Sequence, residues 1–221
     1  MQSRRSRSLV VASVLAASVL ALAAPVSAAT PPIGRWDLRG NLTNGAGTTL
    51  KLAWLGAPIW DNPNQSCITR KAFVFGAGDG LALTGIPRAA RKTYTIDVQF
   101  LIDDMAGYHR ILSFGPNDRD AGLYFYDGHP ALFDHKQEPL ATWDPGTCVL
   151  VRVARNGATG QMKVWVDWGL YITFKDVANE YLLRGGTVDF FQDDGTEHSS
   201  GAASRITFWD KVVPPPNGGH D

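Results

Sequence analysis

The segment FFQDDGTEHSSGA, residues 190–202, gathers Asp193, Asp194 and Glu197 beside a histidine. Oxygen atoms from such a segment could coordinate Ca²⁺, a hard cation that takes several oxygen ligands. Two acids held at different pKa values could instead perform acid–base catalysis. The same side chains could also cap turning backbone N–H groups or contact a ligand directly. The spacing fits no standard calcium loop, so Asp193, Asp194 and Glu197 are candidate metal ligands only and calcium stays an open cofactor.

Arg110, in the segment GYHR, is the cation that best suits these carboxylates. A fork-shaped guanidinium pairs well with carboxylate oxygens, so we expect Arg110 to bridge to this loop. The loop would then be structural and form the rim of a ligand site. On this interpretation the polar ligand-binding candidates are Arg110, Gln192, Asp193 and Asp194.

The chain lacks the residue patterns of common hydrolases. Glycoside hydrolysis needs two carboxylic acids flanking the bond, and the chain's glutamates, Glu138, Glu180 and Glu197, form no Glu-x-Asp-x-x-Glu strand. His129, Asp134 and His135 resemble a metal trio, but their proline-containing segment is more typical of polar surface. No G-x-S-x-G, H-E-x-x-H or phosphate loop is present. A polysaccharide hydrolase or lyase is therefore the alternative, and a non-catalytic role is favoured.

Aromatic residues give the stronger indication of function. The chain has seven tryptophans, six tyrosines and ten phenylalanines, most of which must pack in a core. Tyr124, Tyr126, Trp165 and Trp209 alternate with aliphatic or other core-type residues, so they should face away from the core. A sugar ring can stack its C–H face on such rings, as in the mixed apolar and polar lining of ligand sites. Tyr124, Tyr126 and Trp165 therefore join the ligand-binding candidates.

The elements that position these residues are short strands, because apolar residues alternate with a period of two. In YTIDVQFLI, Tyr94, Ile96, Val98, Phe100 and Ile102 share one face. VLVRVA, MKVWVDW and SRITFWD alternate in the same way, and the second of these places Trp168 on the face of Val164 and Val166. Gly, Pro, Asn and Asp punctuate the strands, and RNGATG predicts a hairpin. Many short alternating strands predict an all-β, antiparallel β-sandwich. Further strands are expected at 49–55, 71–75, 80–85, 110–114, 122–127, 170–174 and 187–191, and one helical turn within 176–184.

The N-terminus predicts export. Arg4, Arg5 and Arg7 precede an apolar run from Leu9 to Ala24 and then PVSAA, the order of a secretory signal peptide. The run is shorter than the ~20 residues of a membrane-spanning helix. We therefore expect a removed leader at 1–29, one domain at 30–212, a flexible tail at 213–221 and a secreted product with no membrane span.

The net charge of the chain limits the expected class of partner. The chain has 21 basic and 21 acidic residues, and loss of the three leader arginines leaves 18 against 21, a formal charge of −3. No basic stripe remains, which argues against nucleic acid as a partner. Carbohydrate or an extracellular protein is the expected partner. The chain's two cysteines, Cys67 and Cys148, predict one disulfide in an exported protein, with two buried thiols as the alternative.

Several segments in order resemble laminin-G-like, concanavalin A-like domains of secreted bacterial proteins. They are WDLRGNLTNGAGTTLKL, KAFVFGAGDGLALTGIP, YTIDVQFLIDDMAGYHRILSFGPNDRDAGLYFYDG, CVLVRVARNGATGQMKVWVD and VDFFQDDGTEHSSGAASRITFWD. The chain departs from the family in reading DWG where Asn-Gly or Asp-Gly is usual, and Ser204 where an acid is common. The second departure weakens an edge calcium site.

This resemblance covers about Trp36 to Asp210 and implies a jelly-roll sandwich. Such domains bind carbohydrate or protein, and some are parts of enzymes, so the fold by itself does not fix the ligand. We expect a carbohydrate-binding module, with a polysaccharide-active enzyme or an adhesive protein as alternatives.

Overall fold

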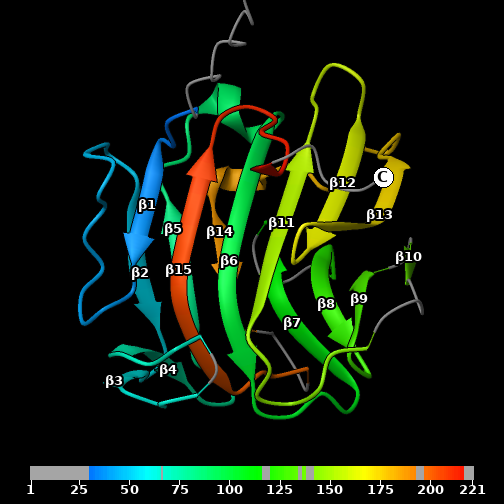
Figure 1. The fold of residues 1–221 in the computed structure, drawn as a ribbon. Helices are drawn as coiled ribbons and strands as arrows, with labels where there is room; N and C mark the ends of the chain where they lie inside the picture. The colour runs from blue at the N-terminus through cyan, green and yellow to red at the C-terminus, as the bar shows by residue number, and fades with distance from the viewer. Residues whose placement is uncertain are drawn as a thin grey trace, which may run out of the picture.

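The computed structural model describes residues 30–65, 67–115, 120–133, 136–137, 142–192 and 197–216. These residues form two antiparallel sheets stacked face to face, which confirms the expected all-β sandwich (Figure 1). The expected leader lies outside the described residues.

The first sheet has eight strands and the second has seven. The order in the first sheet is β13 (Gly169–Lys175), β12 (Gln161–Val166), β11 (Val149–Arg155), β6 (Tyr94–Ile102), β15 (Gly201–Trp209), β4 (Ala72–Phe75) and β3 (Ile59–Asp61), with β1 (Gly34–Asp37) also paired to β15. The order in the second sheet is β10 (Lys136–Gln137), β9 (His129–Leu132), β8 (Gly122–Tyr126), β7 (Tyr108–Ser113), β14 (Val188–Phe190), β5 (Gly80–Thr84) and β2 (Lys51–Leu55). Two short 3-10 turns, η1 (Arg88–Arg91) and η2 (Arg184–Gly186), complete the described elements.

The core lies between the sheets and follows the predicted alternation. All five inward residues of β6, from Tyr94 to Ile102, belong to the main core cluster. Val149, Val151 and Val153 of β11 join them from the neighbouring strand. Burial of these side chains stabilises the fold by roughly 25 cal/mol for each Å² of apolar surface removed from water. The period of two therefore sets which side of each strand is inside.

The hairpin of β8 and β9 was not among the predicted elements, because its second strand contains a proline. Asp127 and Gly128 join the two strands with positive φ angles of 48° and 77°. An Asp-Gly pair with both residues at positive φ is a favoured two-residue hairpin turn. Pro130 lies opposite Phe125 of β8, and the described residues of β10 pair with Leu132 and Ala131, so within the described part of the chain β10 does not pair with Pro130, which lacks an N–H.

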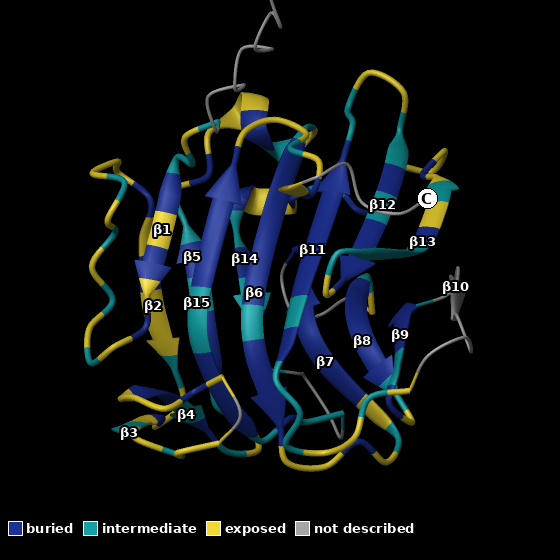
Figure 2. Cartoon of the chain, viewed as in Figure 1, coloured by how far each residue is buried: buried dark blue, intermediate teal, exposed yellow. Residues whose placement is uncertain are grey.

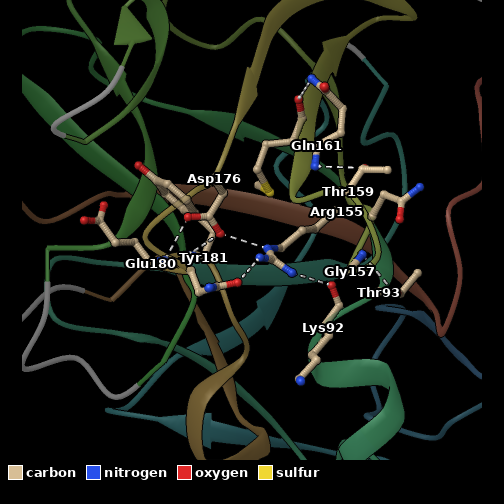
Figure 3. Close-up of polar contacts among 12 residues, drawn as sticks. Lys92, Thr93, Arg155, Gly157, Thr159, Gln161, Asp176, Glu180 and Tyr181 are labelled. Carbon is tan, nitrogen blue, oxygen red and sulfur yellow. Dashed lines mark hydrogen bonds and ion pairs between the residues drawn. The ribbon is translucent and has the colours of Figure 1, made fainter.

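A buried ion pair joins strand ends at one end of the sandwich (Figure 3). The Nε of Arg155 donates to Oδ2 of Asp176 at 2.9 Å. Its two terminal nitrogens donate to the carbonyl of Lys92 and to Oδ1 of Asn179, each at 2.8 Å. A buried charge is stabilising only when its hydrogen bonds are satisfied in this way. Arg155 therefore fixes the β11 end to the loop after β13.

The expected helical turn within 176–184 is absent. The Asp176 carboxylate instead accepts the backbone N–H groups of Glu180 and Tyr181, at 2.8 and 3.3 Å. An aspartate that bonds nearby backbone donors offers them an alternative to helical bonds. The segment forms irregular turns, and a 3-10 turn begins only at Arg184.

The disulfide is confirmed. Cys67 and Cys148 are bonded, with Cα atoms 5.7 Å apart, and the described part of the chain holds no free cysteine. The bond attaches the loop before β4 to the residue that precedes β11.

Candidate functional site

The candidate site lies on the outer face of the second sheet. Leu123 and Phe125 of β8 point into the core, so Tyr124 and Tyr126 point outward, as predicted. In the register of β7 and β8, Tyr108 is opposite Tyr126 and Arg110 is opposite Tyr124. Directly paired residues share a face, so these four side chains gather on one surface. An irregularity in register after Arg110 adds one residue to β7 and turns both Ile111 and Leu112 inward.

Tyr108 and Tyr126 form a close, tilted aromatic pair on this surface. Their ring centroids are 4.2 Å apart and their planes are inclined by 33°. Tyr108 is 37% exposed and Tyr126 is half-buried. Tyr124 lies beneath them, fully buried, with its ring edge-on to that of Tyr108. The pair thus presents aromatic surface to solvent on a fixed aromatic base.

Arg110 is fully buried and holds Tyr124 in place. Its Nε donates to the Tyr124 hydroxyl at 2.7 Å, and Nη2 donates to the same oxygen. The Asp120 carboxylate lies 3.9 Å from Nη2. Arg110 therefore acts within the described structure as a positioning residue behind the tyrosines, and its expected bridge to Asp193 and Asp194 involves residues outside the described part.

Asp189 of β14 is a second acidic group on this face of the sheet, besides Asp120. Val188 and Phe190 point into the core, which turns Asp189 outward, opposite Ala82 of β5. Burial raises the pKa of the Asp189 carboxyl to about 6, against the lowering effect of the Arg110 guanidinium. The carboxyl is therefore partly buried on the outer face, within electrostatic reach of Arg110. Such a carboxyl can accept from or donate to a ligand hydroxyl.

The acidic segment 190–202 is described on either side of positions 193–196. Gln192 donates from Nε2 to the carbonyl of Gly78 at 2.8 Å. At the other end, the Glu197 carbonyl accepts the backbone N–H of Arg110 at 3.3 Å, and the Ser199 hydroxyl donates to the Arg110 carbonyl at 3.0 Å. These bonds attach one described end to the turn before β5 and the other to β7.

The described ends of this segment do not form the metal site that was considered from the sequence. Asp193 and Asp194 lie outside the described residues, as do Asp134 and His135 of the other trio. Among the residues that are described, no three His, Cys, Asp or Glu side chains are grouped to hold a metal ion.

Trp165 lies on the other sheet, so the structure does not bring it to the tyrosines. It points outward from β12 and is only 4% exposed. It lines a cavity of about 190 Å³, and Lys163 Nζ is 5.8 Å from its ring centroid. The remaining lining residues are Ala154, Asn156, Gln161, Val212 and Pro214.

The prediction for Trp168 is wrong. Asp167 and Trp168 form the turn between β12 and β13 with φ angles of 47° and 73°, so the alternation ends at Val166. Trp168 swings to the outer face, where the Arg152 guanidinium lies 4.9 Å from its ring centroid. Trp209 flanks the same guanidinium at 5.2 Å, on the outward side that was predicted for it. Arg152 also donates two bonds of 2.7 Å to the Asp97 carboxylate.

The first part of the expected tail is packed on this face. Arg152 donates to the carbonyl of Pro214 at 2.6 Å, and the Thr95 hydroxyl accepts the N–H of Val213 at 2.9 Å. Carbonyl acceptors over a buried cation hold the segment down, although prolines cannot continue a strand. This cover is one reason why β6 and β11 are buried along most of their length (Figure 2).

Three residues of the site were not predicted. Tyr108 precedes the expected strand, and its alternation with Arg110 was the available signal. Asp189 alternates with Val188 and Phe190, a signal that the sequence did carry. His129 is opposite Tyr126 across the Asp127–Gly128 turn. Its position could have been predicted only if that hairpin had been recognised in the sequence.

Comparisons with known proteins define the fold. No family model matches the chain, and no curated protein matches it. The chain is similar to the binding domain of botulinum neurotoxin DC in complex with rat synaptotagmin II, with a TM-score of 0.60, 12% identity and coverage of 82% of this chain and 48% of that one. It thus spans about half of that chain.

Two further solved structures have the same sandwich. One is domain 4 of an extracellular arabinanase from Geobacillus stearothermophilus in complex with arabinotriose, with a TM-score of 0.58, 9% identity and coverage of 80% and 91%. The other is Trypanosoma rangeli sialidase in complex with the inhibitor DANA, with a TM-score of 0.59, 14% identity and coverage of 81% and 30%. Among the residues described for this chain, no helix is long and apolar enough to cross a membrane.

Proposed function

We propose that the protein is a secreted, laminin-G-like carbohydrate-binding module whose ligand lies on the outer face of the second sheet. The observation that carries this proposal is the partly exposed Tyr108–Tyr126 pair, which lies beside the buried Tyr124 and Arg110. An aromatic platform with a few polar groups suits a sugar, which has an apolar C–H face and a rim of hydroxyls. Solved structures of the same fold are described with arabinotriose and with a sialyl sugar, which supports this class of ligand.

Each residue has a distinct role in this proposal. Tyr108 and Tyr126 contact the sugar ring, while His129, directly opposite Tyr126, bonds to its hydroxyls. Arg110 and Tyr124 are positioning residues, because both are fully buried under the platform. Since the two rings already pack against one another, little side-chain entropy is lost when a ligand binds.

A glycan array with the chain from Thr30 onward tests the proposal. The best ligand should then bind Tyr108→Ala or Tyr126→Ala about tenfold more weakly by calorimetry, as for an aromatic anchor. Trp54→Ala is the matched control, because Trp54 is an exposed aromatic residue of β2 outside the platform. Equal loss in the control, or binding only to a protein receptor, would overturn the proposal.

Export is a separate part of the proposal and rests on the leader sequence. Protein recovered from the culture medium should begin near Ala29 or Thr30 by N-terminal sequencing. A membrane-bound product that keeps Met1 would contradict it.

A further inference from the structure

A second cavity lies on the outer face of the first sheet, next to the disulfide. Its volume is about 130 Å³, close to the ~150 Å³ that admits a benzene-sized molecule. Its lining is mainly polar and comes from four separate parts of the chain. The lining residues are Asp37, Arg39, Cys67, Ile68, Thr69, Arg70, Lys71, Gln99, Ser204 and Arg205.

Four cations converge on this cavity: Arg39, Arg70, Lys71 and Arg205. None of them takes part in the ion pairs found among the described residues. The single acid of the lining, Asp37, lies 3.4 Å from Arg35 and is therefore already partly neutralised. Burial raises the pKa of the Asp97 carboxyl, and Arg205 also acts on this carboxyl, in the lowering direction. In a chain with 21 basic and 21 acidic residues, the four cations form a local excess of positive charge that no ion pair offsets among the described residues.

The backbone holds these cations together. Arg39 follows β1, where the Leu38 N–H donates to the Ser204 carbonyl at 3.0 Å. Arg205 comes directly after Ser204, at an irregularity in the register of β15 against β6. Its side chain therefore points to the outer face, opposite Gln99.

The disulfide supplies the other wall. The Cys67–Cys148 bond ties the loop that carries Arg70 and Lys71 to the start of β11. Gln99 reaches up from β6, with its Nε2 3.4 Å from the Cys67 sulfur. Ile68 packs under the loop against Leu101 and Ala202. The loop is thus fixed on both sides before any ligand binds.

We propose that this cavity binds the anionic group, carboxylate or sulfate, of an acidic saccharide. Guanidinium groups that form no ion pair within the described part of the chain, placed around a small polar cavity, suit a planar or tetrahedral oxyanion, which accepts several charge-assisted hydrogen bonds. The saccharide part of the proposal rests on the proposed function, whereas the oxyanion part does not. The site is on the opposite sheet from the Tyr108–Tyr126 platform, so the two can be tested separately.

Calorimetry with three probes tests the site: an oligogalacturonate, a heparin-derived oligosaccharide and neutral arabinotriose. At least one acidic probe should bind the parent protein, and its affinity should fall as sodium chloride rises from about 20 to about 300 mM because salt screens the charges. The double variant Arg70→Gln/Lys71→Gln and the single variant Arg205→Gln should each bind about tenfold more weakly. Arg88→Gln is the control, since Arg88 is an exposed arginine of η1 that does not line this cavity.

The outcomes distinguish this proposal from the proposed function. Tyr108→Ala should leave binding of the acidic probe unchanged, even if it removes binding of a neutral sugar. If acidic probes bind and no neutral ligand is found, the proposed sugar site at Tyr108 and Tyr126 is contradicted and the anion site in the cavity is supported. No binding of either acidic probe, binding of inorganic sulfate alone, or equal loss in Arg88→Gln would overturn the cavity proposal. Reduction of the disulfide should weaken the acidic probe more than the neutral one.

Discussion

The Asp189 carboxyl is held on the outer face of the second sheet with a pKa raised to about 6 by burial. A carboxyl whose pKa is higher in the folded state binds its proton more tightly there than in the unfolded chain. Its contribution to stability is therefore present at low pH and is lost as pH rises from about 4 to about 6. Asp189→Asn, which mimics the protonated acid, removes this dependence.

We expect the melting temperature of Asp189→Asn to rise relative to the parent protein as pH increases from about 4 to about 7. Melting followed by circular dichroism at several pH values measures this difference. Asp103→Asn serves as the control, because Asp103 is an exposed aspartate outside the sheet face. Identical pH profiles for Asp189→Asn and the parent would contradict the prediction.

The Tyr124 hydroxyl accepts two bonds from the buried Arg110 guanidinium. Tyr124→Phe removes this acceptor and leaves a buried charged donor with fewer bonds. The expected loss is about 1–3 kcal/mol in the free energy of unfolding, measured by urea denaturation. Tyr126→Phe is the matched control and should change stability by less than about 0.5 kcal/mol, because no hydrogen bond of the Tyr126 hydroxyl is present among the described residues. A larger loss in the control than in Tyr124→Phe would refute the assigned role.

Among the elements, the β12–β13 turn has an unusual residue. Trp168 has a φ angle of 73°, where glycine is preferred, and its ring contacts Arg152. Both Trp168→Gly and Trp168→Ala lose this contact, but only glycine also relieves the backbone. We expect the glycine variant to be more stable than the alanine variant by about 1 kcal/mol in urea denaturation.

The other hairpin provides the control for this comparison. Ala158, between β11 and β12, is not among the residues with positive φ. Ala158→Gly should therefore lower stability by up to about 1 kcal/mol, the reverse sign. If alanine and glycine are equivalent at position 168, the strain argument fails.

At the scale of the whole molecule, one disulfide connects positions 81 residues apart. Restricting so long a loop in the unfolded chain is worth roughly 4 kcal/mol on the chain-entropy model. The double variant Cys67→Ser/Cys148→Ser should therefore melt about 8–16 °C lower, at 2–4 °C per kcal/mol for a domain of this size. Calorimetry of the variant beside reduced and oxidised parent protein measures the shift. An unchanged melting temperature on reduction would show that the bond contributes nothing.

Local sequence patterns determined the fold class, the facing of most strands and the cysteine pair. Alternation has a period of two because successive side chains point to opposite sides of a strand, so Leu123 and Phe125 could be assigned to the core without knowledge of any neighbour. The pairing of Cys67 with Cys148 followed from their number and the expected export. Alternation failed at Trp168, where positive φ angles ended the strand.

Only the tertiary structure decided which outward residues share a surface. Tyr126 and Trp165 both face away from the core, yet they lie on different sheets because strand order depends on pairing between distant segments. The same pairing placed Tyr108 against Tyr126 and brought Arg39, Arg70 and Arg205 to one cavity. A residue's side of a strand is a local property, whereas its neighbours on the sheet are set by long-range register, which the sequence pattern does not contain.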